Sequence, residues 1–120
     1  MTFTPVIQSF SHQLDRDIIT TSAVVKDLNQ AKFVLSVLPN ITVTTKLSMI
    51  YRATSNGWAP ADFHKWCDHR GRTVTFYKSS KGFLAGGYTS VKWAGGSGDY
   101  IRDTEAFVFS LTNKMEVFKT

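Results

Sequence analysis

The side chains best suited to chemistry gather on the stretch DFHKWCDH, residues 62–69. His64, Cys67 and Asp68 stand there at positions i, i+3 and i+4, so one helical turn would bring these potential metal ligands together. Structural zinc, however, normally takes four ligands from two separated pairs. Cys67 is the only cysteine, and the one histidine outside this stretch, His12, is far away in the sequence. We therefore expect no metal site.

Cys67 itself allows two interpretations. A reactive thiol needs a lowered pKa, which basic neighbours can provide. The basic neighbours in the sequence are Lys65, His69 and Arg70. A structural cysteine would instead fill a small buried gap beside Phe63 and Trp66, as free cysteines commonly do. We favour burial and keep a redox-active Cys67 as the alternative function.

Other patterns typical of enzymes are absent. AGGSGD, residues 94–99, contains the glycines of a phosphate-binding loop, but no strand-loop-helix context surrounds it and no Lys-Ser or Lys-Thr pair follows. The spacing of serines, histidines and aspartates suggests no catalytic triad. We therefore expect a protein that is not an enzyme and needs no cofactor.

Helical and strand patterns indicate how these residues would be positioned. Apolar side chains at helical spacing predict a helix from Ser22 to Leu38, capped by Ser22 and ended by Pro39. KLSMIYR, residues 46–52, alternates like a strand. A short helix is expected over residues 60–69, since Pro60 suits the first helical turn.

The second half of the chain reads as antiparallel strands. Residues 73–77 and 83–88 predict a hairpin whose turn contains Gly82, and two further strands are expected at 106–111 and 115–119. Gly86 and Gly87 fall inside a strand, which predicts a bulge or a close approach of the backbone. Helices followed by antiparallel strands predict an α+β fold in a single domain, residues 1–120.

Composition narrows the class of protein. The 120 residues are 42% hydrophobic and 19% charged, as in ordinary globular proteins. The net charge of +5 comes from basic residues scattered along the chain, which leaves nucleic-acid binding as a weaker alternative. A single cysteine, no secretory signal and no apolar segment of membrane-spanning length favour an intracellular, cytoplasmic protein.

Four landmarks then follow one another along the chain: IYRATSNGW, DFHKWCD with TVTFYK, GGYTSVKW, and AFVFSLTN. Together they resemble the TLDc domain of the oxidation-resistance proteins, over about residues 15–113. The resemblance implies an antiparallel two-sheet β-sandwich with flanking helices. It also implies that this chain holds only the first part of the domain, so that its last strands would form an edge completed by another chain or another copy. We therefore do not expect a free monomer.

The same resemblance implies a binding function without established catalytic residues. Members of the family associate with the vacuolar proton-pumping ATPase and are linked to resistance against oxidative stress. Loops on a rigid scaffold commonly carry such binding, which directs attention to residues 88–103. The aromatic and polar anchors expected there are Tyr88, Thr89, Trp93, Tyr100 and Arg102.

Overall fold

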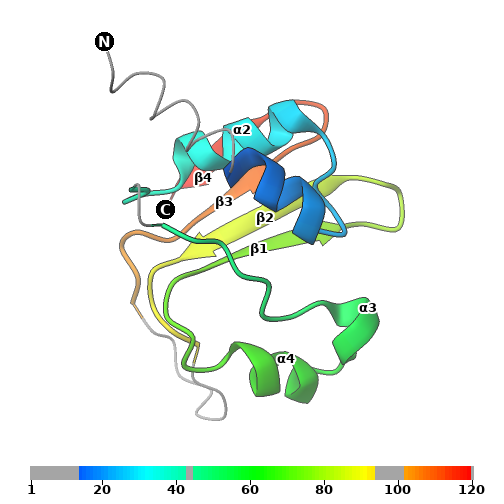
Figure 1. The fold of residues 1–120 in the computed structure, drawn as a ribbon, viewed down its shortest axis with the longest axis vertical. Helices are drawn as coiled ribbons and strands as arrows, with labels where there is room; N and C mark the ends of the chain where they lie inside the picture. The colour runs from blue at the N-terminus through cyan, green and yellow to red at the C-terminus, as the bar shows by residue number, and fades with distance from the viewer. Residues whose placement is uncertain (1–13, 43–44, 94–101, 120) are drawn as a thin grey trace. The chain divides into compact units, whose positions relative to one another are not determined.

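The computed structural model describes residues 14–42, 45–93 and 102–119, in two compact units that divide between Ser48 and Met49. The described part of the first unit is helical, and the second unit holds two helices and a four-stranded antiparallel sheet (Figure 1). This confirms the predicted α+β class. None of the helices in the described ranges has the length and hydrophobicity that a bilayer crossing requires.

The described part of the first unit contains two helices where the sequence predicted one. Residues 14–21 are helical, and α2 runs over Leu28–Val37. The predicted start at Ser22 is wrong. The Ser22 hydroxyl accepts hydrogen bonds from the amides of Val24 and Val25, and these bonds hold the chain in a non-helical connection between the two helices.

Asp27 takes over the capping role predicted for Ser22. Its Oδ1 accepts a hydrogen bond from the Gln30 amide at 3.0 Å, which satisfies one of the free amides at the start of α2. Within α2 the buried residues are Ala31 and Val34. Leu28, the first residue of the helix, is exposed.

The predicted strand at residues 46–52 is also wrong, since no neighbouring strand among the described residues pairs with it. Two hydrogen bonds join the end of this segment to residues 56 and 57 and form a turn. The Arg52 amide donates to Oδ1 of Asn56 at 2.8 Å, and the Tyr51 hydroxyl donates to the Gly57 carbonyl. Helix α3, Ala53–Asn56, lies inside this turn.

Helix α4 runs over Pro60–Cys67 and confirms the predicted short helix, with Pro60 in its first turn. Asp62 accepts a hydrogen bond from the Ala59 amide at 3.2 Å, just before the helix. The helix ends two residues earlier than predicted because His69 adopts a positive φ of 62°. Gly71, with a φ of 86°, then turns the chain toward the sheet.

The sheet follows the order of the chain. Strands β1 (Thr73–Lys78), β2 (Leu84–Thr89), β3 (Phe107–Ser110) and β4 (Glu116–Lys119) lie side by side, each antiparallel to the next. The predicted hairpin is confirmed as β1 and β2, and Gly82 stands in its turn with a φ of 87°. The strand predicted at residues 106–111 is confirmed as β3, along which buried and exposed side chains alternate: Phe109 is 2% exposed and Val108 is 58% exposed.

Gly86 allows the aromatic side chains of the buried face to pack across β2. It stands directly opposite Phe76 on one side and Phe109 on the other, and the rings of these two phenylalanines lie 6.2 Å apart. A Cβ at Gly86 would collide with the Phe109 ring and with the Thr75 carbonyl oxygen. The expected close approach is therefore confirmed at Gly86.

Gly87 differs from its neighbour. The pairing of β2 with β1 and β3 runs through both glycines without interruption, so the predicted bulge is wrong. A Cβ at Gly87 would point to the opposite face, where the nearest atoms are the Phe107 carbonyl oxygen at 3.5 Å and Cγ1 of Val108 at 3.6 Å. These are ordinary van der Waals distances, and nothing in them requires glycine.

We predict that Gly86→Ala destabilises the protein and that Gly87→Ala does not. The first methyl group must displace the Phe109 ring or the backbone, at a cost of about 1–3 kcal/mol typical of overpacking. The second enters open space and lowers the entropy of the unfolded chain, so its effect should stay within about 1 kcal/mol. Urea unfolding of both variants gives their free energies of unfolding. Equal losses of stability in the two variants would show that the close packing around Gly86 does not exclude a methyl group.

Candidate functional site

Three segments of the second unit meet at the end of the sheet where β1 begins and β2 ends. They are residues 68–73, 89–93 and 102–105. Beyond the ends of β1 and β2, hydrogen bonds outside the regular strand pairing join these segments. This junction contains most of the described residues that the sequence predicted as a binding site.

The carboxylate of Asp103 fastens the second segment to the third. Oδ2 accepts hydrogen bonds from the Thr89 hydroxyl and the Ser90 amide, both at 2.7 Å, and from the Val91 amide at 3.2 Å. Oδ1 accepts from the Ser90 hydroxyl at 2.6 Å and from the Glu105 amide at 2.9 Å. We call Asp103 with these five donors the Asp103 clamp.

The clamp also determines the charge of the carboxyl group. The Ser90 and Thr89 hydroxyls, with the backbone amides, donate to the ionised form and hold the pKa of Asp103 far below its usual range. Partial burial acts in the opposite direction and is outweighed. Asp103 is therefore an ionised acceptor at neutral pH, and its oxygens are occupied by internal donors.

Trp93 joins the first segment to the second. Its carbonyl oxygen accepts from the His69 amide at 2.7 Å, and its indole Nε1 donates to the Thr73 hydroxyl at 3.0 Å. The ring meets Phe63 of α4 edge to face, with centroids 5.2 Å apart. Trp93 nevertheless keeps 37% of its surface exposed, so one part of the indole remains accessible.

The predicted anchors therefore have different environments. Thr89 belongs to the clamp, Trp93 is partly exposed, and Arg102 is exposed beside Asp103. Tyr88 is only 6% exposed and stacks on Phe107 at 5.4 Å, so it is part of the buried face in this structure. Its hydroxyl has no hydrogen-bond partner among the described residues. Tyr100 lies outside the described residues.

Sequence reasoning missed Asp103 and Ser90. Asp103 stands 14 positions after Thr89, and no local motif links an aspartate in a loop to hydroxyl groups at the end of an earlier strand. The available signal was the Thr-Ser pair that ends β2, since such side chains commonly form hydrogen bonds at strand ends and turns.

Cys67 is 4% exposed and is a free thiol. Burial, and then the neighbouring Asp68 carboxylate, raise the pKa of this thiol, and the opposing effect of Arg70 is smaller. The favoured burial of Cys67 is therefore confirmed, and burial outweighs the basic neighbour that would lower the pKa of the thiol. Asp68 also accepts from Nδ1 of His64 at 2.8 Å. The described residues hold no cluster of three metal-binding side chains.

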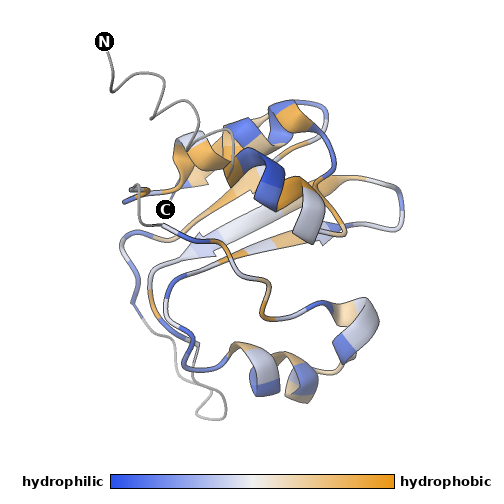
Figure 2. Ribbon diagram, viewed as in Figure 1, coloured by the Kyte–Doolittle hydropathy of each residue, from blue (hydrophilic) through white to orange (hydrophobic). Residues whose placement is uncertain are grey.

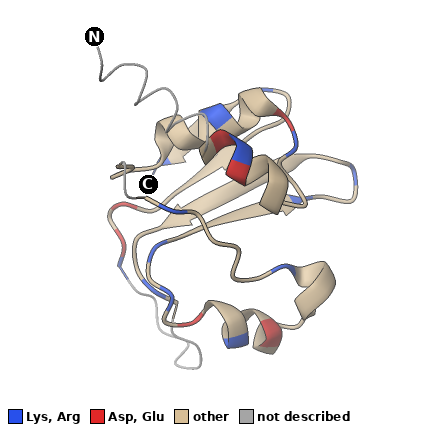
Figure 3. Cartoon of the chain, viewed as in Figure 1, with Lys and Arg blue, Asp and Glu red and all other residues tan. Residues whose placement is uncertain are grey.

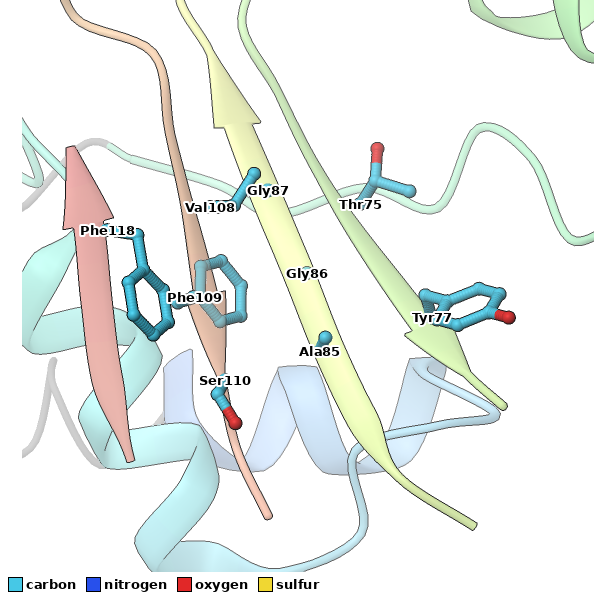
Figure 4. A pocket seen from close by; sticks show the side chains of 9 residues that line it. All are labelled: Thr75, Tyr77, Ala85, Gly86, Gly87, Val108, Phe109, Ser110 and Phe118. Atoms are coloured by element: carbon cyan, nitrogen blue, oxygen red, sulfur yellow. The ribbon is translucent and has the colours of Figure 1, made fainter. Parts of the chain in front are cut away.

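The sheet has a second surface feature away from this junction. A shallow apolar depression of about 380 Å³ lies between Tyr77 on β1 and Phe118 on β4 (Figure 4). Ala85 and Gly87 of β2, together with Val108 of β3, lie between these aromatic side chains. Figure 2 shows that hydropathy is mixed along these strands, with most of β2 pale and β3 more strongly orange. Tyr77, Val108 and Phe118 are exposed, and we call this side of the sheet the open face.

We predict that Asp103→Asn destabilises the protein most at neutral pH. The folded pKa lies below the unfolded value of about 4, so ionised Asp103 stabilises the fold above that pH and loses this contribution as the pH falls. Urea unfolding at pH 7 and pH 3 should show a smaller difference between variant and wild type at pH 3. Glu105→Gln removes an exposed carboxylate of the same segment and is the control; a difference that grows on acidification would contradict the prediction.

We predict that Cys67 in the folded protein reacts slowly with a thiol reagent at neutral pH. Burial and the raised pKa both reduce the concentration of accessible thiolate. The reaction should become fast in urea, and one thiol should be detected because Cys67 is the only cysteine. Rapid labelling of the native protein, at the rate of the unfolded chain, would favour the redox alternative.

Comparison with known proteins and protein families gives the following result. No curated protein matches the chain. The model of the TLDc domain matches residues 15–120, which include α2 and the whole second unit. Since this match covers most of the sequence, the chain belongs to the TLDc domain family.

Proposed function

We propose that this chain is a non-catalytic module that binds another protein. The observation that carries the proposal is the Asp103 clamp within a TLDc domain. Its hydroxyl groups and carboxylate have the chemical types found in catalytic sites, but they are occupied with one another. Such a network is suited to fixing loops, and rigid loops bind at a lower entropic cost.

The partner we propose is the vacuolar proton-pumping ATPase, in a function linked to resistance against oxidative stress. This choice comes from the TLDc resemblance, and with it we propose that the protein acts inside the cell. The burial of Cys67 and its raised pKa favour such a binding role over redox chemistry at the thiol.

We also propose that the sheet is one layer of a two-sheet sandwich. An antiparallel sheet with apolar side chains on both faces commonly packs a second layer on each of them. The open face carries Tyr77, Val108 and Phe118 in exposed positions. A second sheet packed against this face would cover them.

Direct binding to the purified vacuolar ATPase tests the proposed function. We expect saturable co-sedimentation of the wild-type chain with the solubilised pump. Asp103→Asn, which loosens the loops, should weaken this binding by about tenfold, equivalent to about 1.4 kcal/mol. Glu105→Gln should bind like the wild type, because its side chain is exposed and accepts none of the clamp's hydrogen bonds. Absence of saturable binding by the wild type would reject the pump as the partner.

A further inference from the structure

Exposed cationic side chains gather on all three segments of the junction. The first segment carries Arg70 and Arg72, the second carries Lys92 and the third carries Arg102. Figure 3 shows this concentration of Lys and Arg where the chain runs from α4 into β1 and out of β2. The remaining Lys and Arg residues are spread over the other elements, so the even distribution suggested by the sequence does not hold in space.

The backbone fixes these charges relative to one another. Thr73 and Thr89 are paired residues of β1 and β2, which brings Arg72 close to the segment that carries Lys92. The hydrogen bond from the His69 amide to the Trp93 carbonyl joins the same two segments a second time. Arg102 directly precedes Asp103 in the chain. The hydrogen bond from the Ser90 amide to Oδ2 of Asp103 therefore keeps Arg102 close to the end of β2.

Within the described ranges, three of these cations have no internal partner for their charge. Arg72, Lys92 and Arg102 make no hydrogen bond or ion pair with another residue in the described part of the chain. Arg70 differs, since its Nε donates to the Trp66 carbonyl. Among the neighbouring acids, Asp68 faces His64 and Asp103 is enclosed by its clamp. Glu105 is the one described acid of the junction that is exposed.

We propose that Arg72, Lys92 and Arg102 bind an acidic segment of the partner protein. The inference rests on the proposed binding function and adds the chemistry of the partner. Arginine side chains form bidentate hydrogen bonds with carboxylates, and a fixed set of cations recognises a matching set of acids without rearrangement. The exposed part of Trp93 lies on the same segment as Lys92 and offers an apolar contact beside these charges.

An acidic protein segment fits this surface better than a nucleic acid does. Nucleic-acid binding generally uses a longer basic stripe that follows several phosphates. Here three cations lie at one end of the sheet. The open face of the sheet is apolar, so the basic surface does not continue over it. A short run of glutamates or aspartates would engage the three cations together.

A fluorescein-labelled oligoglutamate peptide is the direct probe. We expect the 120-residue chain to bind it in low salt. The triple variant Arg72→Gln, Lys92→Gln, Arg102→Gln should bind about tenfold more weakly, because it loses three exposed ion pairs that each contribute a small amount. The control triple Lys32→Gln, Lys46→Gln, Lys81→Gln removes the same charge at exposed positions elsewhere. It should bind within about twofold of the wild type. Matching thermal melts verify that both triples are folded.

Equal losses in the two triples would overturn the proposal, since only net charge would then matter. Tighter binding of an oligothymidylate than of the peptide would also overturn it, in favour of nucleic acid. The purified pump separates this inference from the proposed function. If the wild type does not bind the pump but the peptide results hold, the proposed partner fails and the acidic-segment surface stands. If pump binding is retained by the junction triple and peptide binding is not specific, the inference fails and the proposed function stands.

Discussion

The proposed binding surface at the junction depends on the hydrogen bonds that the carboxylate of Asp103 accepts. This carboxylate accepts five hydrogen bonds from the end of β2 and from its own segment, and it does so as an anion because those donors hold the pKa of the carboxyl far below its usual range. Hydrogen bonds to a charged group are stronger than neutral ones. The loops at this end of the sheet therefore have a fixed frame without regular secondary structure, and the positions of Lys92 and Arg102 follow from it.

The packing of the sheet that supports these loops requires a residue without a side chain at position 86. Gly86 leaves room for Phe109 to lie across β2 and meet Phe76. The neighbouring Gly87 faces the other side and has ordinary space around it. Two adjacent glycines with the same strand geometry thus have different physical requirements, because successive residues of a strand point to opposite faces.

The concentration of potentially reactive side chains on and after α4 has a structural explanation. Cys67 is buried, and Phe63 makes edge-to-face contacts with Tyr51 and Trp93. Basic neighbours would activate an exposed thiol, but the low polarity of a buried site disfavours the thiolate more strongly. The stretch that attracts attention in the sequence thus serves mainly to join α4 to the rest of the second unit.

By itself, the sequence determined what depends on neighbouring residues: α4 with Pro60, the hairpin around Gly82, the alternation of Phe107 and Phe109, and the four landmarks of the TLDc family. It failed where distant partners decide. Residues 46–52 have a strand pattern, but they pair with no strand among the described residues. Ser22 and Asp27 could each cap a helix, and in the structure Asp27 caps α2 while Ser22 bonds to the connection before it. Only the tertiary structure brings Asp103 to Thr89 and gathers the cations of three segments, because hydrogen bonds between residues far apart in the chain leave no periodic trace in the sequence.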